Sequence, residues 1–236
     1  MAKETYAARC GANVLITPRV QEARIELVDP PRFLYKAGQF ITVPVADQVL
    51  RSYSIASPPD DPGSLVVAVD VQPGGPGSQF FARLKAGDEL KFQGPYGAFV
   101  VRDDALPHLL FIGTGTGIAP LRSMILDLEA RGHGHRKMTL FFGVRYADDL
   151  MYHSEFLALA AKYPETFTYF PSLSKPEGSD WPGHTGRVTA TVPLLLKSTE
   201  DTTAYLCGSK EMLKEVTEIL TGLGMDKKQI KREQFW

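Results

Sequence analysis

The sequence is poor in cysteine and has no excess of charge of one sign. Only two of its 236 residues are cysteines, Cys10 and Cys207. Two thiols are too few for a disulfide framework or for the ligands of an iron–sulfur cluster. The formal net charge is −1, so no overall basic field points to nucleic acid or a membrane surface as a partner.

Long apolar runs are missing as well. None approaches the roughly 18 residues that indicate a membrane-spanning helix, and the N-terminal "MAKETYAARCG" lacks the hydrophobic region of a secretory signal. The five histidines show no zinc-like spacing, and "RGHGH", with His133 and His135, is typical of a polar loop. We therefore expect a cytoplasmic protein without a bound metal, and we expect a monomer.

The residues that are present predict two domains with different patterns. Hydrophobic residues make up 44% and charged residues 22% of the chain, as in globular proteins with a core. The first half contains short strand-like segments rich in β-branched and aromatic residues, separated by Pro, Gly and Asp: "QFITVPV", "LRSYSIAS" and "SLVVAVDVQ". This pattern predicts an antiparallel barrel or sandwich over residues 1–102. One helix is expected within it, at "SQFFARLKAG" from Ser78.

Over residues 103–236 apolar strands alternate with helical patterns. "HLLFIG" precedes a helix with Ile118, Leu121, Ile125 and Leu128 at helical spacing, and Gly132 ends it. Further strands are expected at "MTLFFGV", "TFTYF" and "TAYLCG", with helices near 153–163 and 212–223. Such alternation predicts an α/β domain with a parallel, doubly wound sheet.

The loop "GTGTGIAP" joins the first strand and helix of this second domain. Gly113, Gly115 and Gly117 stand where backbone N–H groups and a helix N-terminus bind phosphate, and glycine lets a ligand approach the backbone closely. A similar loop occurs in methyltransferases, which usually carry an acidic residue just before it, where this chain has "LLFI". A turn that only packs the helix on the strand is the second interpretation.

Six motifs follow one another in the order RSYS, GPYG, GTGTGIAP, GVRY, YLCG and a final EQFW. In this order, across almost the whole chain, they resemble the ferredoxin–NADP reductase superfamily. The resemblance implies a flavin-binding antiparallel barrel followed by a pyridine-nucleotide domain with a five-stranded parallel sheet. It also implies an enzyme that passes hydride from NAD(P)H to FAD, and single electrons onward.

Several first-domain residues would then bind the flavin. Arg51 in "RSYS" offers a fork of donors for phosphate, and the resemblance implies that Tyr53 packs on the flavin ring while Ser54 lies near its N5. Gly77 and Ser78 begin the helix of the barrel and would receive the flavin pyrophosphate, which favours FAD; a plain helix cap and FMN remain alternatives. "GPYG", residues 94–97, is interpreted as a structural turn shaping the flavin pocket.

The second domain and the C-terminus would hold the nicotinamide nucleotide. The resemblance implies that the glycine loop receives the pyrophosphate, with Thr116 near the nicotinamide and Cys207 and Gly208 beside it at the end of a strand. The alternative for Cys207 is a small buried hydrophobe. At the C-terminus, Glu233 and Phe235 match the family's glutamate and flavin-shielding aromatic, and Trp236 would cover the adenine or nicotinamide side of the flavin. A terminal strand packed into the core is the alternative.

Ser174 and Lys175, followed by Arg187 after a glycine, resemble the NADPH-specific pattern, and Arg145 would assist at the adenine ribose. We therefore expect NADP(H) rather than NAD(H), although Lys replaces the usual Arg, and Glu177 and Asp180 stand nearby. Arg187 as a solvated residue at a helix start is the alternative.

The expected acceptor is a ferredoxin or a flavodoxin. Free flavin and ferric complexes are other acceptors. The alternatives are an NADH-dependent reductase component of an oxygenase, a flavin-bearing subunit of a larger complex, and a non-catalytic nucleotide sensor. An exposed apolar patch would favour the role in a larger complex.

Overall fold

The computed structural model describes residues 4–132, 136–176 and 180–234. The chain divides into two compact units, of which the first comprises Met1–Val101 and Arg122–Asp127, and the second Arg102–Leu121 and Leu128–Trp236. The first break lies one residue before the boundary expected from the sequence. The short segment Arg122–Asp127, which the sequence assigned to the second domain, is grouped with the first unit.

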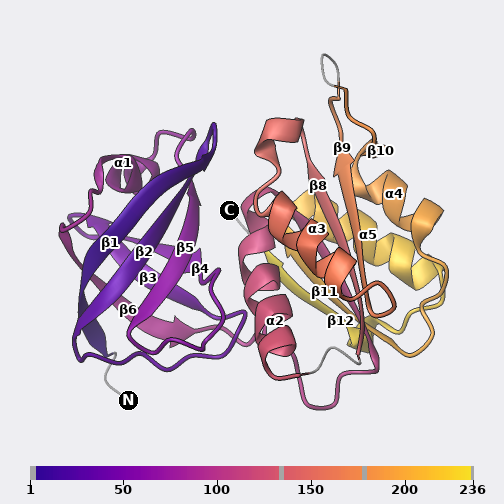
Figure 1. The fold of residues 1–236 in the computed structure, drawn as a ribbon, viewed down its shortest axis with the longest axis horizontal. Helices are drawn as coiled ribbons and strands as arrows, with labels where there is room; N and C mark the ends of the chain where they lie inside the picture. Colours follow the sequence, from indigo (N-terminus) through magenta and orange to yellow (C-terminus); the bar gives the residue numbers. More distant parts are fainter. Residues whose placement is uncertain (1–3, 133–135, 177–179, 235–236) are drawn as a thin grey trace. The chain divides into compact units, whose positions relative to one another are not determined.

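The first unit is a six-stranded antiparallel sheet that closes on itself (Figure 1). Its strand order is β4-β3-β6-β1-β2-β5, and a bridge between Ile55 and Val67 joins the end of β4 to β5. The three strands expected from the sequence are confirmed. The strands are β1 (Thr5–Thr17), β2 (Val20–Asp29), β3 (Phe40–Ala46), β4 (Val49–Ser54), β5 (Ser64–Asp70) and β6 (Glu89–Tyr96).

Aromatic rings fill the interior of this barrel. Phe33 meets Tyr6 edge to face at 4.9 Å and Phe92 at 5.1 Å between ring centroids, and all three are buried. Helix α1 (Pro76–Arg83) buries Phe81 against the same core. It begins two residues earlier than the sequence predicts, because Pro76 occupies the first turn, where its fixed φ and missing N–H cost nothing.

The segment "GPYG" is a strand end and not the turn that the sequence indicated. Gly94–Tyr96 are the last residues of β6. Tyr96 pairs with Phe40 of β3, and the two rings lie 5.8 Å apart. A Cβ on Gly94 would lie 3.3 Å from the Ile41 side chain, so glycine allows β3 and β6 to approach closely. Gly97, the residue after the strand, has a φ of +98°.

The second unit is a parallel sheet with helices on both faces, α2 and α3 in front and α4 and α5 behind in Figure 1. It has six strands in the order β10-β9-β8-β7-β11-β12, where the family resemblance implied five. The six include the two-residue strand β10 and the C-terminal segment, which pairs with β11. The elements are β7 (His108–Thr114), α2 (Ile118–Ala130), β8 (Lys137–Val144), α3 (His153–Lys162), β9 (Phe167–Leu173), β10 (His184–Thr185), α4 (Val188–Leu195), β11 (Thr202–Gly208), α5 (Lys210–Gly222) and β12 (Ile230–Gln234).

Burial explains this arrangement. Residues 109–113 of β7 are buried on both faces, as expected for a central parallel strand. The face of α2 predicted from the sequence, with Leu121 and Ile125, is also buried. The chain leaves α2 at Gly132, with φ +72°. No helix in the described ranges is both long and apolar enough to span a membrane.

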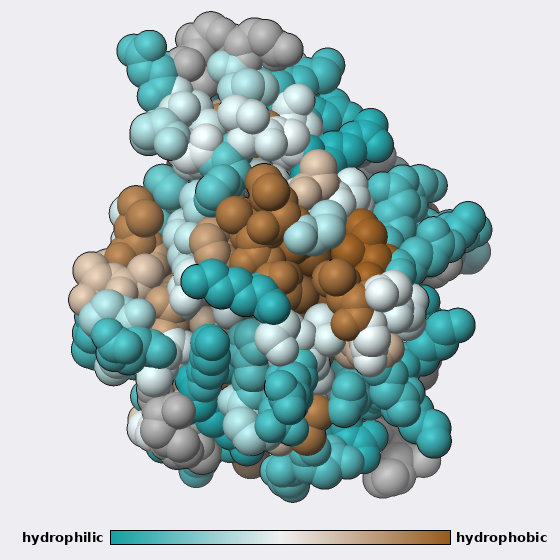
Figure 2. Space-filling model, turned by 90° about the vertical axis from the view of Figure 1, so that its right-hand side faces the viewer, coloured by the Kyte–Doolittle hydropathy of each residue, from teal (hydrophilic) through white to brown (hydrophobic). Residues whose placement is uncertain are grey.

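Apolar side chains also reach the surface of this unit. Figure 2 is a view of the side on which α4 and α5 lie, and it shows a hydrophobic patch, in brown, surrounded by a largely hydrophilic surface, in teal. Leu194 of α4 is 76% exposed, and Leu223, after α5, is 44% exposed.

His108 at the start of β7 links three strands at the edge where the parallel strands begin. Its Nδ1 lies 3.0 Å from Oγ1 of Thr202 in β11, and its Nε2 lies 2.9 Å from Oγ1 of Thr139 in β8. Burial, with a smaller contribution from the charge of Lys137, lowers the pKa of His108 to about 4. The imidazole is therefore neutral at pH 7, and its role is structural.

This histidine makes stability depend on pH. Between pH 6.5 and about 4, the unfolded chain binds a proton at His108 that the folded chain does not, so the free energy of unfolding decreases as pH falls through this window. We expect His108→Gln, whose amide retains hydrogen-bonding capacity, to flatten the decrease relative to the parent protein. Urea unfolding of both proteins at several pH values measures the difference, and parallel curves would contradict the prediction.

Candidate functional site

Strand β4 and the first turn of α1 meet at Gly77. A Cβ on Gly77 would collide with the Tyr53 hydroxyl and would lie 3.4 Å from Cγ of Arg51. The two side chains of "RSYS" expected to share a strand face thus lie together against the start of the helix. Glycine is required for this close approach, and the helix N-terminus adds N–H groups that suit an anion.

Tyr53 is half-buried at this point. Its ring lies 4.7 Å from that of Phe81 in an edge-to-face arrangement. Burial raises the pKa of Tyr53 to about 12, although the charge of Arg51 acts in the opposite direction. The phenol therefore remains a neutral donor at pH 7. Arg51 is exposed, and its Nη1 donates a hydrogen bond to the Leu50 carbonyl at 2.9 Å.

Ser78 contributes differently from the sequence interpretation. Its side chain is buried and its hydroxyl donates to the Asp70 carbonyl at 3.1 Å, so the hydroxyl is already engaged within the protein. What Ser78 offers an anion is its backbone N–H in the first helical turn. The sequence could not show this, because the carbonyl partner lies eight residues away on β5.

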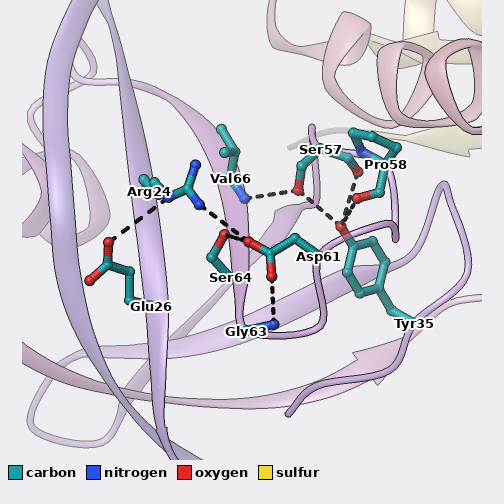
Figure 3. A network of polar contacts seen from close by, with 9 residues as sticks. All are labelled: Arg24, Glu26, Tyr35, Ser57, Pro58, Asp61, Gly63, Ser64 and Val66. Carbon is teal, nitrogen blue, oxygen red and sulfur yellow. Dashed lines mark hydrogen bonds and ion pairs between the residues drawn. The ribbon is translucent and has the colours of Figure 1, made fainter. Parts of the chain in front are cut away.

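The loop after β4 is held by a polar network (Figure 3). Asp61 accepts a hydrogen bond from the Ser64 hydroxyl at 2.7 Å and pairs with Arg24 at 3.2 Å. The Ser64 hydrogen bond is the main reason that the pKa of Asp61 is lowered. At the start of the loop, the hydroxyls of Tyr35 and Ser57 lie 2.9 Å apart. These contacts fix the chain that follows Ser54, which is buried at the end of β4.

In the second unit, the three glycines of "GTGTGIAP" have different roles. A Cβ on Gly113 would lie 2.9 Å from the Leu121 side chain, and one on Gly117 would collide with the Cys207 carbonyl. Both glycines therefore let the turn and α2 pack on the sheet, the role that the sequence left as an alternative. Gly115 is exposed, has φ +53°, and has no atom within 4 Å of its Cβ position. It is the position where a ligand has room.

The turn of residues 115–117 is a single 3-10 turn that leads directly into α2. Thr116 lies within it and is half-buried. Its backbone is at the start of a 13-residue helix, where the unpaired N–H groups and the helix dipole favour a phosphate.

Cys207 lies at the end of β11, beside this turn. It pairs in register with Gly113 of β7 on one side and with Glu233 of β12 on the other. The thiol is fully buried, and burial, together with the Glu233 charge, raises the pKa of Cys207 well above its usual value. The sulfur is therefore a protonated, uncharged group at pH 7, as expected for a residue that is not a nucleophile.

The C-terminal segment forms β12, the edge strand next to β11. Its first residue, Ile230, is buried, and Glu233 is half-buried. A terminal strand was the alternative interpretation of this segment, and it holds for Ile230–Gln234. Phe235 and Trp236 lie outside the described residues.

A group of cations gathers where β8 and β9 end and α4 begins. The Lys175 N–H donates to the Arg145 carbonyl at 2.9 Å, and the Ser174 N–H donates to the Val144 carbonyl at 2.9 Å. Arg187 is the N-cap residue of α4, and the preceding Gly186 N–H donates to the Leu173 carbonyl at 2.8 Å. The four expected residues of the adenosine end thus lie on adjoining segments of one sheet edge.

The three basic side chains of this group, Arg145, Lys175 and Arg187, are all exposed. Within the described part of the chain, none of them has an ion pair. Asp180, one of the two acidic residues expected nearby, is exposed, and Glu177 lies outside the described residues. The edge therefore presents positive charge without an internal counter-ion among the residues described.

Sequence reasoning missed two residues at the centre of the same edge. Thr114 ends β7, and its side chain lies against Gly208 and 3.5 Å from a Cβ position on Gly143. Ser172 of β9 is fully buried, and its hydroxyl has no hydrogen-bond partner among the residues described. The only sequence feature that indicated Thr114 was its position between the glycines of "GTGTG". No sequence feature indicated Ser172.

Comparison with known proteins agrees with this geometry. Residues 11–101 match the oxidoreductase FAD-binding domain, and residues 111–218 match the oxidoreductase NAD-binding domain. Ferredoxin–NADP reductase B of Sorangium cellulosum is 35% identical, and the match covers 98% of each chain. One component of the Na(+)-translocating NADH-quinone reductase of Neisseria gonorrhoeae is also 35% identical, over 85% of this chain, which spans 52% of that protein.

The solved structures agree as well. The cytochrome P450 reductase GcoB of Amycolatopsis has a TM-score of 0.89 and 28% identity, and the match covers 99% of this chain and 70% of that one. The two domain matches cover both units of the fold, and the relative from Sorangium cellulosum is similar over 98% of both chains. The chain therefore belongs to the ferredoxin–NADP reductase family and is an NAD(P)H-dependent flavoprotein reductase that binds FAD and a nicotinamide nucleotide.

Proposed function

We propose that this reductase oxidises NADPH in preference to NADH and delivers the electrons to a ferredoxin or a flavodoxin. The observation that carries the nucleotide preference is the cation group Arg145, Lys175 and Arg187 on one exposed edge. A 2′-phosphate, which distinguishes NADPH from NADH, is recognised by such cations.

The flavin phosphates are proposed to bind between Arg51 and the start of α1. The close approach of Gly77 to Tyr53 and Arg51 supports this assignment, because it brings cationic and N–H donors together at one place. FAD bound there would supply the acceptance of a hydride and the release of single electrons, chemistry that the protein's own side chains lack. The role of Tyr53 and Ser54 is then to hold the flavin ring at the end of β4.

The nucleotide pyrophosphate is proposed to bind at Gly115 and Thr116. Open space at Gly115 and the helix N-terminus supply the room and the donors. Cys207 would border the nicotinamide as an apolar, protonated surface, because its buried thiol does not ionise at pH 7. We propose Glu233, next to it in register, as a further catalytic residue at the same edge. Phe235 and Trp236 are proposed to shield the flavin.

Ferredoxin or flavodoxin is proposed as the acceptor because the relative from Sorangium cellulosum, similar over 98% of both chains, is a ferredoxin–NADP reductase. An NADH-dependent role within a larger assembly is the second candidate. The relative from Neisseria gonorrhoeae, which is one part of an NADH-quinone reductase, favours it, as does the exposed apolar patch over α4 and α5.

Steady-state kinetics separate the candidates. We expect kcat/KM for NADPH to exceed that for NADH with ferricyanide as acceptor, and we expect reduced ferredoxin or flavodoxin to accumulate with NADPH as the donor. Equal efficiencies for the two nucleotides would contradict the preference. A protein that reduces ferricyanide but neither carrier would contradict the acceptor assignment.

A further inference from the structure

We propose that Trp181 is a positioning residue for NADPH, because it fixes the position of Arg187 relative to Lys175. This role rests on the proposed function, in which the two cations bind the 2′-phosphate. The chain leaves the sheet after β9 with Lys175 and comes back as residues 180–187, here called the returning segment, which ends at Arg187. Trp181 lies near the start of the returning segment, and all three residues belong to the second unit.

Lys175 and Arg187 are held to the sheet by different means. The backbone N–H groups of Ser174 and Lys175 donate to the carbonyls of the last residue of β8 and of the residue after it, so Lys175 continues the pairing of β8 with β9. The returning segment pairs with β9 only through the two residues of β10 and through the hydrogen bond from the Gly186 N–H to the Leu173 carbonyl, at 2.8 Å. So short a pairing contributes little stability by itself, and the returning segment therefore depends on a further contact.

Trp181 supplies this contact on the side of the sheet that α3 covers. Its ring lies 5.8 Å from the ring of His153, the first residue of α3. His153 is held in turn by β9, because its Nδ1 lies 3.2 Å from the Tyr169 hydroxyl. Burial lowers the pKa of His153, so the contact joins two uncharged rings at pH 7. The indole N–H of Trp181 donates to the His184 carbonyl at 3.0 Å, which ties the ring to the first residue of β10.

His184 holds the same segment from the opposite face of β9. Its ring lies 5.8 Å from that of Phe170, and Phe170 packs against the core that α4 and α5 share with the sheet. Successive side chains of a strand point to opposite faces, so Tyr169 and Phe170 lie on the two sides of the sheet. The returning segment is therefore attached to both faces of β9, by Trp181 on one face and by His184 on the other.

The turn between Trp181 and His184 requires glycine at position 183. A Cβ on Gly183 would lie 2.6 Å from Cζ2 and 2.7 Å from Cε2 of the indole, so only glycine lets the ring lie over the turn. The φ of Gly183 lies outside the left-handed region. The reason for glycine here is therefore space for the Trp181 ring and not backbone conformation.

The returning segment sets the direction of the Arg187 side chain. Arg187 has extended backbone angles, φ −71° and ψ 155°, and the helix begins only at Val188, which is buried. The core thus fixes the start of α4, whereas the returning segment fixes the direction from which Arg187 reaches it. Loss of the Trp181 contact releases this exposed cation while α4 stays packed. The 2′-phosphate is remote from the nicotinamide ring, so the loss affects NADPH affinity and not hydride transfer.

Removal of the indole tests this role through steady-state rates. Trp181→Ala is expected to raise KM for NADPH by a factor of about five, the effect of displacing one exposed cation from a phosphate, while kcat and the KM for NADH stay within about twofold. Trp181→Phe keeps a ring against His153 and should restore most of the affinity for NADPH. Equal increases in KM for both nucleotides would indicate general damage and would overturn the role of Trp181.

Gly183→Ala displaces the indole without removing it, because the new Cβ occupies the place of the ring. It should raise KM for NADPH as much as Trp181→Ala does, and the double variant should be no worse than either single variant, since both changes break one contact. Gly222→Ala is the matched control, because its Cβ position is open and it lies at the end of α5. Effects of Gly183→Ala and Trp181→Ala that add in the double variant would overturn the inference.

Titration calorimetry of the full chain with 2′,5′-ADP and with ADP isolates the contribution of the 2′-phosphate. We expect the parent protein to bind 2′,5′-ADP more tightly than ADP, and we expect Trp181→Ala to lower the ratio of the two affinities by a factor of about five. A Trp181→Ala variant that keeps the ratio of the parent would overturn the role of Trp181 and leave the NADPH preference standing. A parent protein that binds the two ligands equally would contradict the NADPH preference itself, and the role of Trp181 with it.

Discussion

Lys175→Ala combined with Arg187→Ala is expected to lower kcat/KM for NADPH by a factor on the order of 30, while kcat/KM for NADH stays within about twofold. The physical reason is that both side chains are exposed cations at the sheet edge, without ion pairs among the described residues. They are therefore available to the one group that NADPH has and NADH lacks. Initial rates with ferricyanide at constant ionic strength measure both efficiencies.

Lys227→Ala combined with Lys228→Ala is the matched control for this experiment. These two exposed lysines lie before β12, at the opposite edge of the sheet, and their removal changes the net charge by the same amount. We expect the control variant to retain the preference for NADPH. Equal decreases in kcat/KM for both nucleotides in the Lys175/Arg187 variant would show that these cations do not bind the 2′-phosphate.

Gly77→Ala is expected to weaken FAD binding by about tenfold or more without unfolding the barrel. The added Cβ collides with the Tyr53 hydroxyl and approaches Arg51, so it displaces the two side chains proposed to hold the flavin. The collision is with the tip of a side chain and not with the backbone, so we expect the barrel to remain folded. Alanine also favours the helix over glycine by up to about 1 kcal/mol. Flavin titration of the apoprotein, followed by fluorescence quenching, measures the affinity.

Gly75→Ala provides the comparison two residues earlier. Gly75 is the N-cap of α1 with φ −71° and ψ 173°, which alanine adopts readily, and no atom lies within 4 Å of its Cβ position. We expect its flavin affinity to remain close to that of the parent protein. A loss of affinity that is the same in the two variants would indicate damage to the helix start rather than to the contact of Gly77 with Tyr53.

The sequence predicts the two kinds of fold well because hydrophobic periodicity reports burial directly. The strands around Arg51 alternate apolar and polar residues, as half-buried strands do. The run before Gly113 is continuously apolar, as in a strand buried on both faces. Local signals also located α2, whose end at Gly132 follows from the need for a positive φ. Motif order then indicated the family, which comparison of the whole chain confirms.

Contacts between distant residues could not be predicted in this way. The Ser78 hydroxyl is engaged by a carbonyl on β5, and Gly117 is glycine because the Cys207 carbonyl lies against it. "GPYG" has the composition of a turn, yet pairing with Phe40 makes it a strand end. Each outcome depends on a partner that belongs to another strand, and a local sequence pattern gives no information about such a partner.

The visible absorption spectrum of the purified protein, recorded before and after addition of NADPH without oxygen, tests the central assignment most directly. We expect the absorption bands of bound flavin, and we expect NADPH to bleach them at a higher rate than an equal concentration of NADH. A colourless protein that takes up neither FAD nor FMN on reconstitution would contradict the assignment, and so would flavin bands that neither nucleotide bleaches.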